Sequence, residues 1–327
     1  MSGTVLFLSA AEVGRALTMP AAITAVREAF VELSTGNAEV PLRTPVSLSG
    51  DGGALFMPVY LPSQGRLGLK VVTVVPDNAE RGLPMIQALV AVFDAATGRT
   101  EAVMDGEVLT AVRTGAASGV ATDLLARRDA SVAAVIGAGV QGRRQLEAVC
   151  CVRAIRETLV FDPDRERAEV FANDMSRVLK RRVRVLDEVS GVFAADVICT
   201  ATSANTPVVA DRDVAPGTHV NAIGAYRPHT REVPGETMAR ARLFVDSRSA
   251  CLAEAGELVM AMEEGLLAAD CAPVEIGEVA AGTAGGRQTD DEVTIFKSVG
   301  NAVQDLAVAG LVLGEARRLD LGTEVEL

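Results

Sequence analysis

One glycine-rich turn in the sequence has the residue spacing needed to hold a phosphate-bearing ligand. Residues 132–136 form an apolar run, the turn GAGVQG follows, and helix-compatible sequence comes next. A strand, a glycine turn and a helix in this order form a dinucleotide-binding unit. Gly137 permits the tight turn, Gly139 lets the backbone approach a pyrophosphate, and Gly142 lets the helix pack on the strand. The helix N-terminus then presents free N–H groups to the phosphates.

An acidic residue stands at the distance beyond this turn where such units bind ribose. Asp162 ends the run TLVFD, and a carboxylate there can accept hydrogen bonds from both ribose hydroxyls while repelling a 2′-phosphate. The position therefore favours NAD, whereas Arg165 and Arg167 just beyond it leave NADP as the alternative. Asp162 is also compatible with a helix N-cap before Pro163.

Small and hydroxylated residues follow two later apolar runs. Thr200 ends the run 196–200, Ala201 and Thr202 follow it, and Gly224 comes after residues 219–223. Because ligands of doubly wound sheets bind beyond the carboxyl ends of the strands, these residues are predicted to contact the cofactor.

Three cations in the first third of the chain could hold a second, anionic substrate. Lys70 lies in GLKVVTVV, which is apolar on both strand faces, so a buried functional cation is favoured over an exposed one. Arg113 stands before Thr114 at an expected helix start, where a carboxylate or phosphate could bind. Arg43 is as compatible with an ordinary ion pair as with a ligand.

The N-terminal elements that would position these cations are mostly strands. Helical spacing covers residues 20–36, and a small-residue helix is expected over 116–125. The candidate strands are 46–48, 54–57, 68–75 and 86–93. This pattern predicts an antiparallel or mixed sheet with one or two helices.

Residues beyond 130 alternate strand and helix. The candidate strands are 132–136, 157–162, 183–187, 196–200, 219–223, 242–246 and 274–276, and the candidate helices are 141–153, 165–180 and 249–264. The alternation predicts an α/β fold with a Rossmann-type doubly wound parallel sheet. Residues 297–319 are expected to form one helix that returns to the first domain; the alternative is that this helix completes the nucleotide domain.

Composition excludes several classes of function. The chain has 327 residues, enough for two domains, and a net charge of −12 with no basic stripe, so no nucleic-acid partner is expected. Five cysteines without a CxxC pair and only two histidines predict no metal site. The N-terminus does not resemble a signal peptide, and no apolar window reaches the roughly eighteen residues of a membrane span, so a cytoplasmic protein is expected.

Several segments together resemble one family. They are GLKVV, Asn78 with Gly82-Leu83-Pro84, Phe93-Asp94 with Thr97-Gly98, LTAVRTGAAS, VIGAGVQG, NAIGA with the RP and RE pairs that follow it, and TIFKSVGNAVQDLA. In this order, over about residues 40–310, the chain resembles the ornithine cyclodeaminase/mu-crystallin family. The resemblance implies a homodimer. It also implies a substrate-binding and dimerisation α+β domain from residues 1–120 with 302–327, and a dinucleotide-binding domain from residues 121–301.

The resemblance also implies roles for individual residues. Arg43 and Arg113 would bind a substrate carboxylate, and Lys70 would hydrogen-bond near the reacting centre. The dinucleotide would be held by Thr114, Gly139, Val140, Gln141 and Asp162, with Lys297 and Ser298 bordering the nicotinamide.

One departure from the family pattern bears on the reaction. Cyclodeaminases and alanine dehydrogenases of the family carry an aspartate where this chain has Tyr226. Because a tyrosine with a pKa near 10 is a poor base at neutral pH, reduction of a preformed imine is favoured over cyclodeamination. Tyr226 is either the acid of that reaction or a residue that shapes the pocket.

The predicted function is therefore NAD(P)H-dependent reduction of an α-imino acid. Δ1-pyrroline-2-carboxylate and Δ1-piperideine-2-carboxylate are the expected substrates, each giving the cyclic L-amino acid. The alternatives are ornithine cyclodeamination, an amino-acid dehydrogenase of the alanine dehydrogenase type, and a non-catalytic mu-crystallin-like binding protein.

Overall fold

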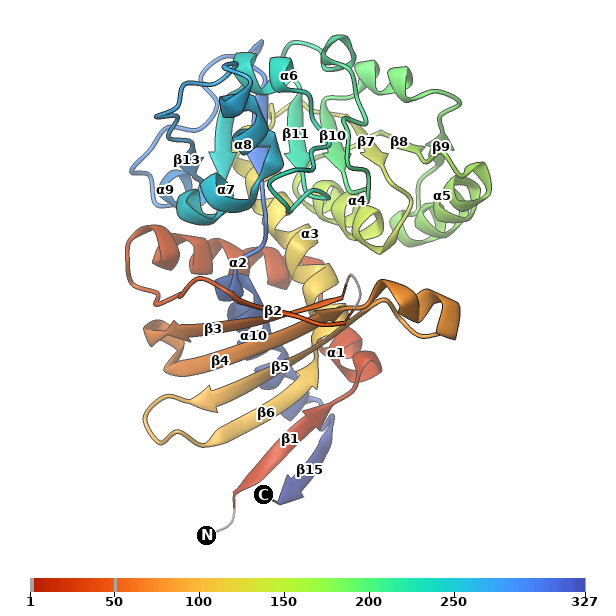
Figure 1. Cartoon of the computed structure of the whole chain (residues 1–327). Helices are drawn as coiled ribbons and strands as arrows, with labels where there is room; N and C mark the ends of the chain where they lie inside the picture. The colour runs from red at the N-terminus through yellow and green to blue at the C-terminus, as the bar shows by residue number, and fades with distance from the viewer. Residues whose placement is uncertain (1–2, 50–51, 327) are drawn as a thin grey trace. The chain divides into compact units, whose positions relative to one another are not determined.

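The chain divides into two compact units. The computed structural model describes residues 3–49 and 52–326. Unit 1 comprises Met1–Arg113 and Asn301–Leu327, and unit 2 comprises Thr114–Gly300 (Figure 1). Residues 1–2, 50–51 and 327, which the predicted substrate-binding domain includes, lie outside the described residues. The functional assignment of each unit stays a prediction.

Unit 1 is built on a mixed sheet with the strand order β15-β1-β6-β5-β4-β3-β2. Its strands are β1 (Thr4–Leu8), β2 (Thr44–Ser47), β3 (Gly53–Leu61), β4 (Arg66–Val74), β5 (Ile86–Asp94), β6 (Thr100–Asp105) and β15 (Thr323–Glu326). β1 and β6 are parallel, and the other neighbouring pairs are antiparallel. The sequence analysis missed β1, β6 and β15.

The helices of unit 1 cover one face of this sheet. They are α1 (Ala10–Ala16), α2 (Met19–Ser34), α10 (Ala302–Arg318) and the first part of α3 (Gly106–Leu125). α10 packs on α2 and on β3, β4 and β5, and its first nine residues are all buried. A residue on that face of β4 therefore lies beneath α10.

Unit 2 is a parallel sheet with the strand order β13-β12-β14-β11-β10-β7-β8-β9. The strands are β7 (Val132–Ile136), β8 (Glu157–Phe161), β9 (Val183–Val185), β10 (Val197–Thr200), β11 (His219–Ala222), β12 (Arg242–Val245), β13 (Val274–Glu275) and β14 (Thr294–Lys297). The chain runs from β7 to β8 and β9 on one side, then returns to β10 on the other. This reversal is the switch point of a doubly wound fold, and it confirms the predicted fold class.

The helices of unit 2 differ from expectation at three places. They are the part of α3 after Arg113, α4 (Val140–Val152), α5 (Arg165–Leu179), α6 (Gly235–Arg240), α7 (Arg248–Glu254), α8 (Gly256–Glu263) and α9 (Ile276–Ala280). The sequence analysis did not predict α6 or α9. The predicted helix 249–264 is two helices, because Ala255 is extended. A Cβ on Gly256 would lie 2.0 Å from the carbonyl oxygen of Thr230, so the close approach of another segment accompanies this break.

The prediction of one helix over residues 297–319 is wrong in its first residues. Lys297 ends β14, a fully buried strand between β11 and β12. α10 begins only at Ala302, where the Asn301 side chain accepts a hydrogen bond from the Val303 N–H at 3.0 Å. The sequence analysis assigned no strand to residues 294–296, because periodicity alone does not identify so short a buried apolar run as a strand.

The expected helix start at Arg113 is also wrong. Arg113 lies inside α3, whose N-terminus is capped by Asp105 through a 2.9 Å hydrogen bond from the Val108 N–H. The backbone N–H groups around Arg113 therefore serve the helix itself and no ligand. The small residues that follow serve packing, because a Cβ on Gly115 would lie 2.6 Å from the carbonyl oxygen of Arg144 in α4.

Two glycines of the turn after β7 differ in their surroundings: Gly142 is packed against rigid backbone, and Gly139 faces open space. An added Cβ on Gly142 would lie 2.1 Å from the Gly137 carbonyl oxygen, whereas one on Gly139 would have nothing closer than 3.9 Å. We expect Gly142→Ala to destabilise the protein by about 1–3 kcal/mol, because rigid backbone must move. Gly139→Ala is the matched control and should cost less, at most about 1 kcal/mol, because it meets no rigid atom and loses only the preference of the N-cap for glycine over alanine. Thermal unfolding measures both, and an equal Tm for the two variants would contradict the packing argument.

Candidate active site

Two predicted cations of unit 1 share one buried carboxylate oxygen. Lys70 Nζ in β4 donates to Asp305 Oδ1 in α10 at 3.0 Å, and Arg113 Nε in α3 donates to the same oxygen at 3.0 Å. Arg113 Nη1 also donates to Gln304 Oε1 at 2.8 Å. Lys70, Arg113 and Asp305 are 3%, 6% and 1% exposed, so this is a charged cluster inside the protein.

The local sequence explains why α10 comes close enough to make these bonds. Lys70 pairs in register with Met57 and Val90, whose side chains share its face of the sheet and are buried. Gly68 lies two residues earlier on the same face, and a Cβ there would stand 2.8 Å from Leu306 Cδ1. The glycine of GLKVV thus makes room for Leu306 and brings the adjacent Asp305 within reach of Lys70.

The charge of the cluster is not balanced by Asp305 alone. Burial lowers the pKa of Lys70 to about 8, with Asp305 opposing that shift and the charges of Arg113 and Arg43 adding to it. The structure therefore brings Lys70 and Arg113 together at one carboxylate, and the charge of Arg43 acts on Lys70. Asp305 Oδ2 accepts no hydrogen bond from the described residues. A site with excess buried positive charge is suited to an anion such as a carboxylate.

The glycine turn of unit 2 is a tight turn between β7 and α4, and its binding of a dinucleotide stays a prediction. Gly137 has φ +104°, and a Cβ on it would lie 2.5 Å from the Ala201 carbonyl oxygen, so the turn after β7 abuts the loop after β10. Gly139 is the N-cap of α4. The space above Gly139 is open enough for a phosphate to approach the backbone.

Asp162 is bound to the turn rather than to the following helix. Its Oδ2 accepts a hydrogen bond from the Ala138 N–H at 2.8 Å, and Oδ1 accepts one from the Asp164 N–H at 3.0 Å. The N-cap of α5 is Asp164, which accepts from the Arg167 N–H, so the interpretation of Asp162 as the helix cap is wrong. The carboxylate is fixed beside the turn, where a ribose would lie in such a fold.

Arg165 and Arg167, the two residues that kept NADP as an alternative cofactor, differ in their surroundings. Arg165 pairs with Glu169 at 2.9 Å and with Asp187. The Arg167 guanidinium lies nearest to the open space at Gly139, with Nη2 3.9 Å from an added Cβ. Arg165 is thus engaged by two carboxylates, which disfavours its binding a 2′-phosphate.

Glu232 fixes the loops that carry the other predicted cofactor residues. Its carboxylate accepts hydrogen bonds from Thr200 Oγ1 at 2.8 Å, from Thr202 N and Oγ1 at 2.6 and 2.7 Å, and from Gly224 N at 2.6 Å. The side chain is fully buried. One acid therefore joins the ends of β10 and β11, a role that the sequence analysis did not assign to it.

Lys297 and Ser298 are engaged within unit 2. Lys297 Nζ donates to the Ala225 carbonyl oxygen and forms a 3.0 Å ion pair with Glu257. Ser298 Oγ donates to Asp246 Oδ2 at 2.6 Å. Their predicted place beside the nicotinamide stays a prediction; what the structure shows is that Lys297 supports the backbone next to Tyr226.

The remaining predicted residues lie at varied depths in unit 2. The Thr114 carbonyl oxygen accepts from Gln145 Nε2 at 3.3 Å, and Thr114 itself is buried. Val140 is 66% exposed, and Gln141 Oε1 is buried with no hydrogen-bond partner among the described residues. Tyr226 is 39% exposed, with the Arg227 guanidinium 5.6 Å from its ring centroid.

Sequence reasoning missed Gln304 and Asp305, although a signal was present. The two polar residues interrupt an otherwise apolar helix, and an acid in such a position is buried and therefore needs a cation. Within the residues that the structure describes, no group of three or more His, Cys, Asp or Glu side chains could hold a metal ion. No helix in the same residues is long and apolar enough to cross a bilayer.

Comparison with known proteins shows the family to which this chain belongs. The profile of the ornithine cyclodeaminase/mu-crystallin family matches residues 4–319, so the chain belongs to this family. A Δ1-pyrroline-2-carboxylate reductase of Bacillus cereus is 36% identical over 324 residues, covering 98% of this chain and 99% of the relative.

Two solved structures are similar over the whole chain. The Δ1-pyrroline-2-carboxylate reductase of Thermococcus litoralis, in complex with NADH and L-proline, has a TM-score of 0.95 and 39% identity, covering 98% of this chain and 100% of its own. An archaeal alanine dehydrogenase dimer with bound NAD has a TM-score of 0.94 and 35% identity, covering 99% of this chain and 100% of its own.

The lysine content of the chain makes the titration of Lys70 directly measurable. The three lysines are Lys70, Lys180 and Lys297. We expect the Lys70 side-chain signal in lysine-labelled protein to titrate with a pKa of about 8, because burial disfavours the ammonium form. NMR of the ¹³Cε positions measures it, with exposed Lys180 as the internal reference. A Lys70 signal that titrates with the ordinary lysine pKa of 10.5 would contradict the buried-cluster geometry.

Proposed function

We propose that this chain is an NAD(P)H-dependent reductase of cyclic ketimines. The reaction adds a hydride to the carbon and a proton to the nitrogen of the C=N bond in Δ1-pyrroline-2-carboxylate or Δ1-piperideine-2-carboxylate, giving the cyclic L-amino acid. The observation that carries this proposal is the buried pair of cations Lys70 and Arg113, on which the charge of Arg43 also acts, in a chain that also has a dinucleotide turn.

The cationic cluster supports a substrate that carries a carboxylate. Arg113 uses two of its N–H groups to bind α10 and has about five in all, so it retains donors for a ligand. Lys70 adds a protonated amine below its pKa of about 8. Bound in this way, a planar imino acid would be oriented by its carboxylate, and the orientation would supply much of the rate.

The glycine turn supports a nicotinamide dinucleotide, which supplies the hydride when it is bound. Gly139 leaves the backbone open to a pyrophosphate, and the Asp162 carboxylate stands where the ribose hydroxyls would donate. Asp162 favours NAD over NADP, and the engagement of Arg165 by Glu169 and Asp187 adds to that preference. The relatives with bound NADH or NAD support the same choice.

The residue at position 226 supports imine reduction over cyclodeamination. Tyr226 stands where the cyclodeaminases have an aspartate, and a phenol is a poor base at neutral pH. We keep its hydroxyl as the candidate proton donor to the imine nitrogen. The names of the similar Bacillus and Thermococcus proteins support the same reaction.

The reaction can be tested by the loss of NADH absorbance at 340 nm with each cyclic ketimine. We expect turnover with Δ1-pyrroline-2-carboxylate and formation of L-proline. Lys70→Ala should lower kcat/KM by about 100-fold or more, because a charged partner of the bound carboxylate is lost. Lys180→Asn removes an exposed lysine that has φ 52°, a conformation that asparagine tolerates, and should leave turnover unchanged.

Other outcomes of this assay distinguish the alternative functions. Ammonia and proline formed from ornithine without net NADH change would contradict the reductase proposal in favour of a cyclodeaminase. Reversible NAD-dependent turnover of alanine alone would favour an amino-acid dehydrogenase. NADH binding without turnover of any imine would favour a binding protein.

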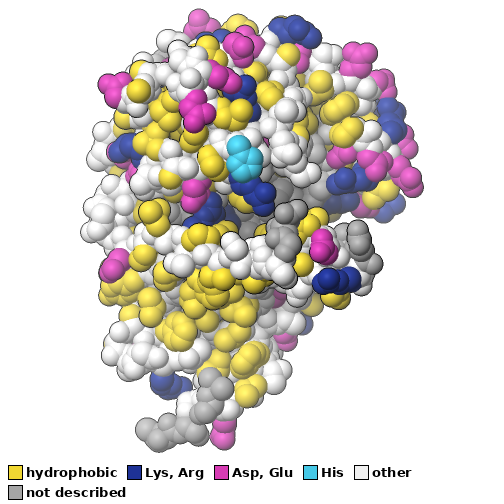
Figure 2. Space-filling model, in the orientation of Figure 1, with side chains coloured by type: hydrophobic (Ala, Val, Ile, Leu, Met, Phe, Trp, Pro, Cys, Tyr) yellow, Lys and Arg dark blue, Asp and Glu magenta, His cyan; other side chains and the backbone are white. Residues whose placement is uncertain are grey.

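We also propose that the chain forms a homodimer through the sheet of unit 1. Phe56, Val71 and Leu89 lie opposite one another in register on the sheet face away from α10, and Phe56 and Leu89 are 38% and 43% exposed. Figure 2 shows hydrophobic side chains gathered over this sheet. Monomers rarely expose apolar patches of this kind without a partner.

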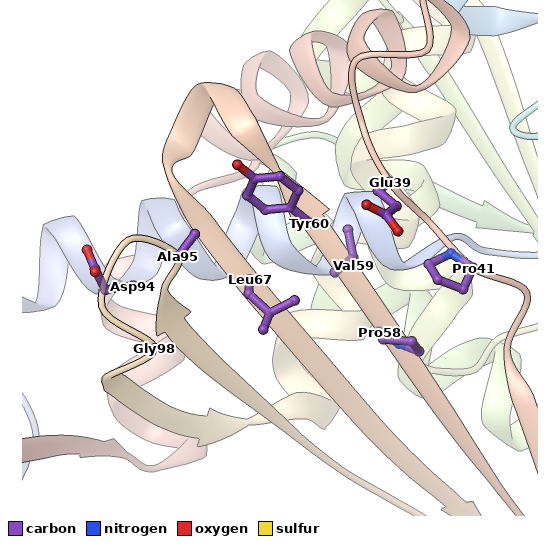
Figure 3. Close-up of a pocket in the computed structure, with 9 residues that line it drawn as sticks. All are labelled: Glu39, Pro41, Pro58, Val59, Tyr60, Leu67, Asp94, Ala95 and Gly98. Carbon is purple, nitrogen blue, oxygen red and sulfur yellow. The ribbon is translucent and has the colours of Figure 1, made fainter.

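A shallow cavity of about 360 Å³ continues this face (Figure 3). Pro58, Tyr60 and Leu67 line it from β3 and β4, and the turn from Asp94 to Gly98 closes one side. None of the predicted catalytic or cofactor residues lines it. We therefore assign the cavity to the apolar face and not to the active site.

Light scattering after size exclusion tests the dimer. We expect the wild-type protein to have twice the chain mass of 34.0 kDa. Leu89→Arg should shift it toward the monomer, because a charge would be buried in the contact. Val178→Arg, at a residue of α5 that is 61% exposed, is the matched control and should stay dimeric. A monomeric wild type, or an unchanged Leu89→Arg dimer, would contradict this interface.

A further inference from the structure

We propose that Asp305 is the positioning residue and counter-ion that keeps Lys70 protonated and aligned beside Arg113 for a ligand carboxylate. This inference rests on the proposed function for the identity of the ligand. Its core, the action of Asp305 on Lys70, concerns residues of unit 1 alone and can be measured without any ligand.

The geometry gives Asp305 a role that a single ion pair would not have. One oxygen, Oδ1, accepts from both Lys70 Nζ and Arg113 Nε at 3.0 Å, so the two cations are fixed relative to each other through a common atom. Gln304, the preceding residue of α10, holds a second nitrogen of Arg113 at 2.8 Å. Two consecutive residues of one helix thus fix the guanidinium and the amine together.

The negative charge of Asp305, and not only its hydrogen bond, favours the protonated form of Lys70. The charged groups that act on Lys70 are Asp305 from α10, Arg113 from α3 and Arg43 from the segment before β2. The register neighbours Met57 and Val90 on β3 and β5 are uncharged. Burial and two cations all favour loss of the lysine proton, and Asp305 is the one group among them that favours its retention.

An isosteric variant separates charge from shape. In Asp305→Asn the amide oxygen can still accept the bonds from Lys70 and Arg113, but the negative charge is gone. We expect the NMR titration of the Lys70 ¹³Cε signal to move down by about 1–2 pH units from its wild-type midpoint, because the main opposing charge is lost. Asp305→Glu keeps the negative charge, so its Lys70 midpoint should lie close to that of the wild type.

The matched control is Glu101→Gln. Glu101 pairs with Arg66 at 2.9 Å and with Arg317 at 3.1 Å, is only partly exposed, and also lies in unit 1, but neither partner is in the cationic cluster. The same loss of one negative charge there should leave the Lys70 midpoint unchanged. A midpoint equally shifted by Glu101→Gln would contradict a specific role for Asp305.

Binding of pyrrole-2-carboxylate, a planar carboxylate without a reducible imine, gives the second readout. In wild-type protein with NADH, Kd should rise as the pH passes about 8, where Lys70 loses its proton. In Asp305→Asn, that rise should begin at lower pH by the same 1–2 units, with Kd at about pH 6 retained within roughly threefold. If Asp305 had only a structural role, Asp305→Asn would instead raise Kd by the same factor at every pH.

The two readouts distinguish failure of this inference from failure of the proposed function. An unmoved Lys70 midpoint in Asp305→Asn would overturn the role of Asp305, whatever the enzyme does with imines. A moved midpoint with no pyrrole-2-carboxylate binding at any pH would uphold the action of Asp305 on Lys70 and contradict the proposed carboxylate site. Unfolding of Asp305→Asn at every pH, with Asp305→Glu folded and normal in both readouts, would uphold the need for the charge.

Discussion

The placement of Lys70 and Arg113 inside unit 1 depends on their shared hydrogen bonds to the carboxylate of Asp305. It is 1% exposed and serves Lys70 and Arg113 through one oxygen. Charges in the interior cost several kcal/mol each unless they are paired and hydrogen-bonded, so Asp305 lowers the cost of keeping both cations at this depth. Asp305 lies in α10, which belongs to the C-terminal segment of unit 1. The C-terminal segment must therefore pack on the N-terminal part of unit 1 before the two cations are paired.

Unit 2 uses a buried acid in a comparable way, but to fix backbone rather than side chains. Glu232 binds donors at the ends of β10 and β11, and Asp162 binds the glycine turn after β7. The loops at the carboxyl ends of three neighbouring strands are therefore set before any cofactor arrives. A site formed in this way loses little conformational entropy on binding. The two units thus share one device, a carboxylate that satisfies several donors at once.

Local patterns in the sequence predicted the elements with strong periodicity and the residues with distinctive chemistry. The glycine turn, the doubly wound sheet and Lys70 were recognisable because spacing and residue type define them locally. β14 was missed because so short a buried apolar run has no period that identifies it as a strand, and the start of α3 was placed too late because the helix was recognised only from its small residues 116–125. Gln304 and Asp305 could not be connected to Lys70 or Arg113 from spacing, because pairing across some 200 residues depends on tertiary packing.

Gly68 has a consequence for how this site could change over evolutionary time. It touches no ionisable group, yet the space it leaves for Leu306 sets how closely α10 approaches β4. Any larger residue there would press on the helix and lengthen the reach from Asp305 to Lys70. Substitution of this glycine would therefore change the geometry of the cationic cluster without changing any residue that belongs to it.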